Sequence, residues 1–306
     1  MEKKPVTDSG LSRQVEGRLT RNIRRDGRHN VRRVGRTWQA FHPWLAVVNM
    51  SWPGFVVLVG GLYALVNVTF AVLYFAMGPD AVQGSAAETE GRRFLNDFFF
   101  SGHTLTTVGY GTLAPVGVLA NITATLEALV GLLAFSVITG LLVARASRPS
   151  ARIEFSPNAL IAPYQDGKAL MFRIANQRSN NLMELEARII VQQVVPKDGK
   201  PSRKIDYLSL EMDKVELFPL TWTVVHAITP TSPIWGLDAK GLEELQTEFI
   251  VLLKGFDDTF SQTVHTRFSY RADEVVWDAK FIQAFHVADD GGYMLYLNRV
   301  GDFEKL

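Results

Sequence analysis

The residues with the clearest chemistry form one short stretch, Thr106-Thr107-Val108-Gly109-Tyr110-Gly111. A potassium ion gives up its water shell only to a ring of oxygen dipoles, and backbone carbonyls can supply that ring. Successive carbonyls face one axis only if left-handed and right-handed backbone conformations alternate along the strand. Gly109 and Gly111 permit this because glycine readily adopts a positive φ. Val108 and Tyr110 are expected to point away and pack on the preceding helix. We interpret Thr107, Val108, Gly109 and Tyr110 as potassium ligands of a selectivity filter over residues 107–111.

The segments on either side decide between this filter and a glycine-rich turn of a soluble protein, which the stretch alone would also fit. Residues 52–77 contain no charge and, at about 1.5 Å per residue, exceed a hydrocarbon core of about 30 Å. Residues 116–145 are similarly apolar. Residues 94–106 are too short to span and indicate a re-entrant pore helix, tolerated at membrane depth beside an ion-filled space. The sequence therefore predicts a pore domain over residues 51–149, and one filter strand per chain predicts a homotetramer.

Three residues inside the second span need a separate explanation. Glu127 is its only charge before Arg145. A lone carboxylate in a membrane is usually functional, as a proton relay, an ion site or a hydrogen-bonding group, and we favour the last, behind the filter or pore helix. Gly131 and Gly140 permit bending or close packing, and either property would serve a gate.

The N-terminal part of the chain is strongly basic. Residues 1–50 hold eleven Lys or Arg against four acids, although the net charge of the whole chain is +1. We expect a disordered basic arm over residues 1–37, close to an anionic membrane face; no aromatic residue or nucleic-acid motif supports binding to nucleic acid. Residues 38–50 carry two tryptophans at helical spacing, which favours an interfacial slide helix over a helix of a soluble domain.

The remainder, residues 150–306, changes to short alternating runs separated by Gly, Pro and Asp. This pattern predicts a cytoplasmic, antiparallel, immunoglobulin-like β-sandwich with a single helix over residues 238–246. The chain has no cysteine, phosphate-binding loop or metal-ligand spacing, so disulfides and thiolate chemistry are excluded and nothing favours an enzyme. The fold class is thus a two-transmembrane-helix pore domain, followed by a β-sandwich.

Together these features resemble the bacterial inward-rectifier potassium channels, the KirBac family, over roughly residues 38–300. The resemblance rests on Ser51-Trp52-Pro53, on residues 104–111 with Pro115, on Leu126-Glu127 and Val130-Gly131, on Ala144-Arg145 and Arg148-Pro149, and on His226-Ala227-Ile228 followed by Ser232-Pro233-Ile234 and Gly236. It implies a passive homotetrameric potassium channel, gated by the cytoplasmic domain and by anionic phospholipid. Arg145 and Arg148 are the matching lipid-binding positions.

Three positions depart from the family pattern. Phe135 stands at the cavity position that is acidic in strong rectifiers, so we expect weak block by intracellular polyamines. Val143 replaces a bulky aromatic at the inner constriction, which leaves the position of the gate open. His103 replaces the Glu or Gln of the pore helix, so the usual salt bridge behind the filter is lacking, and its protonation is expected to make conduction depend on pH.

The whole pattern predicts a multi-pass protein of the inner (plasma) membrane with cytoplasmic termini. Its ligands are K⁺ and membrane lipid, and it is classed with the voltage-gated channels. Two other functions are alternatives to a channel. In one, the sandwich is a sensor and the membrane part only an anchor, so Gly109→Ala would be harmless. The other, a membrane enzyme, lacks a nucleophile and base or a metal cluster.

Overall fold

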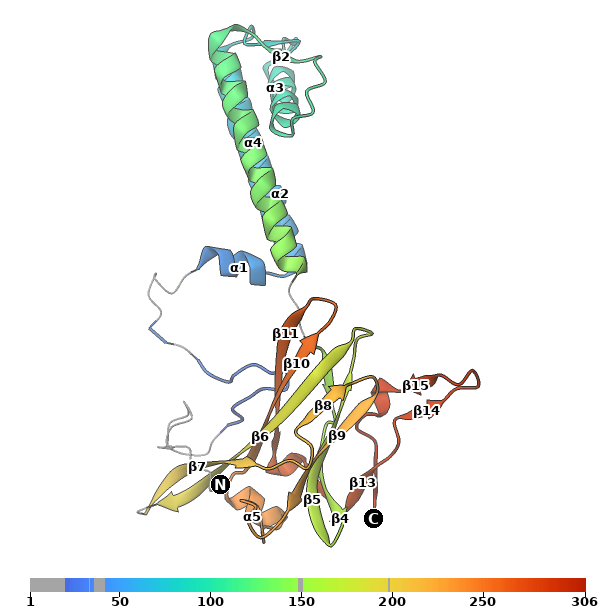
Figure 1. The fold of residues 1–306 in the computed structure, drawn as a ribbon. Coiled ribbons are helices and arrows are strands. Elements are labelled where there is room, and N and C mark those ends of the chain that lie inside the picture. The colour runs from blue at the N-terminus through green and yellow to red at the C-terminus, as the bar shows by residue number, and fades with distance from the viewer. Residues whose placement is uncertain (1–19, 33, 36–41, 148–150, 198) are drawn as a thin grey trace. The chain divides into compact units, whose positions relative to one another are not determined.

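The computed structural model describes residues 20–32, 34–35, 42–147, 151–197 and 199–306. The chain divides into two compact units. One contains residues 35–148 and is helical. The other combines residues 149–306 with the N-terminal residues up to 34 and is built of β-strands (Figure 1).

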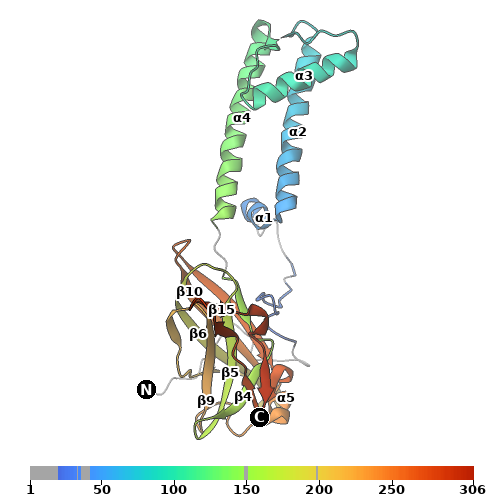
Figure 2. The ribbon, with the colours of Figure 1, turned by 90° about the vertical axis from the view of Figure 1, so that its right-hand side faces the viewer.

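Four helices form the helical unit, and α3 lies across α2 and α4 (Figure 2). Ser51 caps α2 by accepting a hydrogen bond from the N–H of Gly54, and Gly78 ends it at φ 103°. The pore helix begins earlier than residue 94 because Thr89 caps it, accepting from the N–H of Arg92. The bounds are α1 (Pro43–Asn49), α2 (Trp52–Met77), α3 (Glu90–Leu105) and α4 (Gly117–Ala146), with a short pair of strands, β1 (Val82–Gln83) and β2 (Ala114–Pro115).

The long helices α2 and α4 have the length and composition of membrane spans. Each contains an 18-residue window of mean hydropathy 2.2. On α2 the buried side chains are limited to Phe55, Asn67, Ala71 and Tyr74. Most other apolar side chains of these helices are exposed within one chain, as expected where lipid or further protein covers them.

The β-unit is a sandwich of two five-stranded sheets (Figure 1). One sheet contains β6 (Leu182–Lys197), β7 (Lys200–Leu208), β8 (Lys214–Leu217), β10 (Glu248–Asp257) and β11 (Gln262–Arg271). The other contains β3 (Ile153–Phe155), β4 (Ala159–Tyr164), β5 (Gly167–Asn176), β9 (Thr221–Ile228) and β12 (Val275–Trp277). Both sheets contribute to one core, for example Phe172 and Ile174 from β5 and Val251 and Leu253 from β10. Helix α5 (Ala239–Glu244) lies within the predicted helical range.

The sandwich differs from the expected pattern in one pairing. Strand β12 runs parallel to β4, whereas the other pairs within the two sheets are antiparallel. Beyond β12 the chain forms two small strand pairs, β13 (Ala279–Phe281) with β16 (Phe303–Lys305) and β14 (Phe285–Val287) with β15 (Tyr293–Leu295).

This C-terminal segment explains why strand β5 is buried on both faces. Phe172 and Ile174 enter the core, while Arg173, which points the other way, is only 4% exposed. Its guanidinium donates to the carbonyls of Ile282 (2.5 Å), Val300 (2.8 Å) and Arg299 (2.9 Å) and lies over the ring of Phe281. The segment therefore holds a buried cation by backbone oxygens.

Residues 20–32 do not form the free arm expected from their charge. They pack against the sandwich, with Ile23 2% exposed and bridged to His29. The physical reason is specific pairing: acidic side chains of the sandwich accept hydrogen bonds from this segment, an attraction that composition alone does not reveal. The rest of the predicted arm lies outside the described residues.

Candidate functional site

The filter backbone alternates in hand as its chemistry requires. Thr107, Gly109 and Gly111 have φ of 59°, 53° and 81°, and they alternate with Val108 and Tyr110. Alternation turns successive carbonyls toward the same side of the strand, which is the donor arrangement that a dehydrated K⁺ needs. A positive φ was expected at the two glycines and not at Thr107. A non-glycine residue with positive φ is strained.

The pore helix positions this strand through its last turn. The carbonyl of His103 accepts from the N–H groups of Val108 (2.9 Å) and Gly109 (3.2 Å). The N–H of Thr107 donates to the carbonyl of Thr104 at 3.0 Å. Helix α3 therefore runs directly into the filter, and its partial negative end lies at the inner end of the strand, where it favours a cation.

The side chains of the filter have few partners within one chain. The ring of Tyr110 packs edge-on against His103, with centroids 4.8 Å apart, which agrees with packing on the preceding helix. Even so, Tyr110 is 71% exposed and Val108 is 51% exposed. The filter strand thus leaves apolar surface that a single chain does not cover.

Glu127 lies at the junction of the three long helices. It is fully buried, and its carboxylate accepts from the Tyr74 hydroxyl of α2 (2.8 Å) and lies 2.5 Å from the Ser101 hydroxyl of α3. The Ser101 hydroxyl also lies 3.1 Å from the carbonyl of Asn67. This placement, behind the pore helix, is the one that we favoured for a hydrogen-bonding glutamate.

The partners of Glu127 were missed from the sequence, although a signal was present. Asn67, Ala71 and Tyr74 recur at helical spacing on α2 and form one buried stripe. A second buried pair was also missed: Asp97 bonds the Ser85 hydroxyl, and Arg93 donates to the carbonyl of Phe75 and lies over its ring. The contacts of Glu127 and those of Asp97 and Arg93 hold the pore helix against α2 and against the loop that precedes the pore helix.

The predicted cavity and gate residues follow α4. Gly131 lies against the end of the pore helix, where an added Cβ would stand 2.0 Å from the carbonyl oxygen of Leu105. Gly140 has open space around it. Phe135 lines an apolar hollow together with Thr107 and Gly131. Phe135 and Val143 are 69% and 58% exposed, so they too lack partners within one chain.

Arg145 has a definite structural role. Its guanidinium donates to the carbonyls of Val47 (2.6 Å) and Met50 (2.8 Å), at the C-terminal end of α1, and lies 4.7 Å from the rings of Trp52 and Phe55. The side chain therefore ties the short interfacial helix to the end of α4. Arg148, its predicted companion, and Trp38 of the slide helix lie outside the described residues.

The donor set suits K⁺ and not a tightly ligated metal. Backbone carbonyls and a threonine hydroxyl are neutral oxygens, as conduction without trapping requires. In the part of the chain that the structure describes, no group of three or more His, Cys, Asp or Glu side chains could hold a metal ion.

Comparison with known proteins gives the same picture for both units. A family model described as "Inward rectifier potassium channel C-terminal domain" matches residues 153–305, and one described as "Ion channel" matches residues 62–148. The inward rectifier potassium channel Kirbac3.1 of Paramagnetospirillum magnetotacticum is 36% identical over 286 residues, which cover 92% of this chain and 95% of that protein.

Animal proteins are more distant and longer. The ATP-sensitive inward rectifier potassium channel 12 of Bos taurus is 30% identical, over 69% of this chain and 54% of its own length. The inward rectifier potassium channel 4 of Rattus norvegicus is also 30% identical, over 67% of this chain and 50% of its own length. The chain thus spans nearly all of the bacterial relative and about half of these animal relatives.

Proposed function

Because the chain belongs to the inward rectifier potassium channel family, we propose that four copies of this potassium channel assemble around one axis, with residues 107–110 lining the shared pore. The alternating hand of the filter carries this proposal. One strand supplies a quarter of each oxygen ring, so a closed ring needs four chains. The exposed Val108, Tyr110, Phe135 and Val143 provide the apolar surface that neighbouring copies would cover.

The classification as voltage-gated is wrong, since inward rectifiers are not voltage-gated. A voltage sensor needs several arginines within a membrane helix. Among the described residues, the two candidate spans carry only Glu127 and Arg145, and Arg145 stands in the last turn of α4. Conduction here is passive, and K⁺ permeates.

We place the protein in the inner (plasma) membrane with both termini in the cytoplasm. Arginines precede α1 and follow α4, whereas the connection between α2 and α3 is short and has no such excess of basic residues. We also expect a transporting protein without enzymatic activity.

For gating, we propose that Arg145 transmits movement between the slide helix and the inner helix. Three hydrogen bonds to the end of α1 and contact with two aromatic rings support this role. Anionic phospholipid would bind Arg148 and those N–H groups of Arg145 that do not donate to the end of α1. Glu127 and His103 would hold the pore helix, while Gly131 and Gly140 shape α4 between filter and gate.

The test is uptake of radioactive rubidium by liposomes that contain the purified full-length protein. We expect barium-sensitive uptake that outcompetes sodium and changes with the fraction of anionic lipid. Gly109→Ala should lose selectivity or assembly, because alanine at φ 53° is strained. Unchanged behaviour of that variant, or a purified protein that remains a monomer, would favour the membrane-anchored sensor.

A further inference from the structure

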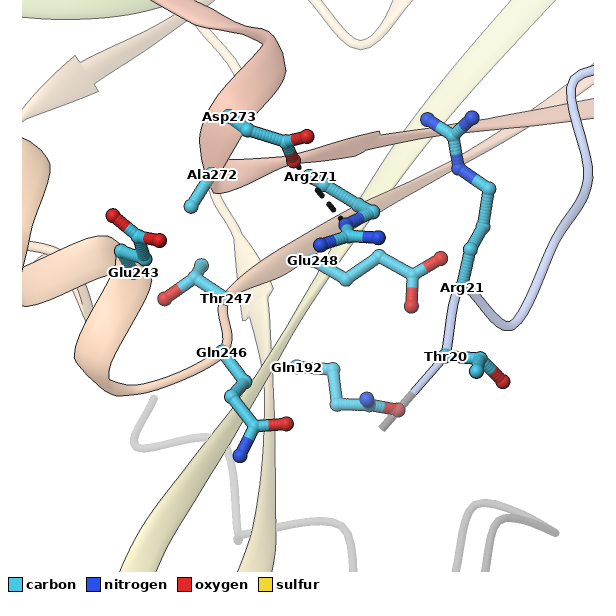
Figure 3. A pocket seen from close by; sticks show the side chains of 10 residues that line it. All are labelled: Thr20, Arg21, Gln192, Glu243, Gln246, Thr247, Glu248, Arg271, Ala272 and Asp273. Carbon is cyan, nitrogen blue, oxygen red and sulfur yellow. Dashed lines mark ion pairs between the residues drawn. The ribbon is translucent and has the colours of Figure 1, made fainter. Parts of the chain in front are cut away.

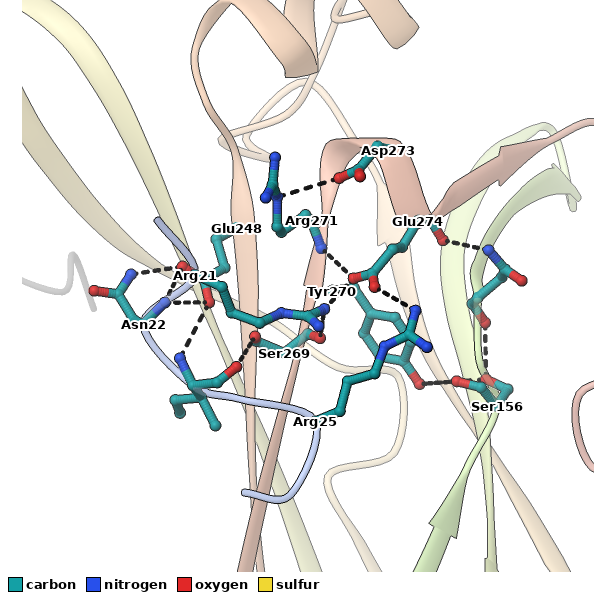
Figure 4. Close-up of polar contacts among 12 residues, drawn as sticks. Arg21, Asn22, Arg25, Ser156, Glu248, Ser269, Tyr270, Arg271, Asp273 and Glu274 are labelled. Carbon is teal, nitrogen blue, oxygen red and sulfur yellow. Dashed lines mark hydrogen bonds and ion pairs between the residues drawn. The ribbon is translucent and has the colours of Figure 1, made fainter. Parts of the chain in front are cut away.

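Residues 20–29, here called the strap, are held on the sandwich at two acidic side chains (Figure 4). The first is Glu248 at the start of β10, which is 4% exposed. It accepts from the backbone N–H of Asn22 (3.0 Å), from the Asn22 amide (2.5 Å) and from the N–H of Ile23 (3.5 Å). The Asn22 amide also donates to Gln192 of β6 at 3.0 Å. The buried carboxylate thus binds two backbone N–H groups and one side-chain amide of the strap.

The second acidic side chain is Glu274, just beyond β11. It accepts from Arg21 and, at 2.8 Å, from Arg25, as well as from the backbone N–H of Arg271 at 3.0 Å. Arg21 also donates to the carbonyl of Ser269 at 2.7 Å. Two arginines of the strap therefore converge on one carboxylate.

Beyond Ile23 the strap makes a tight turn on the edge of β11. Ile23 pairs with His29, and Gly27 has φ 76°. An added Cβ at Gly27 would stand 2.9 Å from the carbonyl oxygen of Arg267, so the turn approaches the strand closely. Two other arginines, Arg24 and Arg28, remain exposed on the docked strap.

The seat of the strap is polar and incompletely packed. A pocket beside it is lined by Thr20 and Arg21 of the strap and by the ends of β10 and β11 (Figure 3). The Thr247 hydroxyl in its wall is buried without a hydrogen-bond partner. Apart from Ile23, the strap is thus held by charge and hydrogen bonds, which salt and competing anions weaken.

We propose that the strap is detachable, and that an anionic membrane surface competes with Glu274 for its arginines. Glu274 pairs with two of the strap's four arginines, Arg21 and Arg25, whereas a lipid surface offers anions to all four. Release would free the residues that lead into the slide helix, and membrane composition would thereby act on the channel through its N terminus. The inference rests on the proposed function, in which the channel lies among anionic lipids.

Hydrogen–deuterium exchange of the full-length protein in lipid nanodiscs tests this directly. In neutral discs we expect the amides of Asn22 and Ile23 to be protected. In anionic discs, and in Glu274→Gln or Glu248→Gln in neutral discs, they should exchange about tenfold faster or more. Asp273→Asn is the matched control, because Asp273 pairs with Arg271 and not with the strap.

Equal protection in neutral and anionic discs would overturn the proposal, as would unchanged exchange in Glu274→Gln. The amides of β5 report whether each variant is folded; if Glu248→Gln loosens them, the variant of the less buried Glu274 decides. Rubidium uptake measured on the same preparations separates the two claims. Lipid-dependent exchange without barium-sensitive uptake would count against the channel and not against the strap.

Discussion

Gly131→Ala is expected to damage the filter from behind. An added Cβ would meet Leu105 backbone atoms at 2.0 Å (O), 2.9 Å (C) and 3.2 Å (Cα), and real Cβ contacts essentially never fall below 3.0 Å. The pore helix or α4 must therefore retreat by about 1 Å, and backbone cannot rotate away as a side chain would. Overpacking of this kind typically costs about 1–3 kcal/mol.

Gly140→Ala in the same helix is the matched control. Nothing lies within 4 Å of its added Cβ, and alanine favours a helix by up to about 1 kcal/mol over glycine. We expect Gly131→Ala to lower the melting temperature of the detergent-solubilised protein and the ratio of rubidium to sodium uptake, and Gly140→Ala to leave both unchanged or raise the first. A Gly131→Ala protein with wild-type stability and selectivity would refute the close contact.

Three further predictions follow from single side chains. Tyr74→Phe removes a donor to the buried Glu127 carboxylate and should cost about 1.5–3 kcal/mol, seen as a lower melting temperature; an unchanged value would contradict the network. Phe135→Asp places carboxylates in the cavity and should strengthen block by intracellular polyamines in patch recordings, whereas potent block of the wild type would contradict the present assignment. Burial lowers the pKa of His226, whose Nδ1–H donates to Ser209 and whose Nε2 accepts from Ser232. The unfolded chain then binds the proton more readily, so the sandwich should lose stability as pH falls below about 6.5, and His226→Gln should flatten that dependence in thermal unfolding.

The sequence predicted the features that depend on local pattern. The bounds of α2 agree with the 26 charge-free residues, and the filter glycines have the expected positive φ. Alternation after residue 150 likewise predicted the β-sandwich, which the two five-stranded sheets form. In each case a single periodicity or a single backbone requirement decides the structure.

What could not be predicted depends on partners distant in the sequence. Nothing near Glu127 identifies Tyr74, which lies 53 positions away, and nothing in a basic arm identifies Glu248 as its seat, 226 positions from Asn22. Arg145 shows the same limit: its charge suggested lipid, while its hydrogen bonds go to the end of α1. Charge gives affinity for an opposite charge, and only the fold shows which one is within reach.

The carbonyl cage around Arg173 has a consequence for how the chain is made. Its acceptors lie 109 to 127 positions later, at Ile282, Arg299 and Val300. While the protein is being synthesised, strand β5 leaves the ribosome long before those residues exist, so its guanidinium must stay hydrated and the second face of β5 open. The sandwich is completed last, at its C-terminal segment. A chain that ended before residue 299 would either leave the Arg173 guanidinium hydrated and the second face of β5 open, or bury the guanidinium without two of these acceptors.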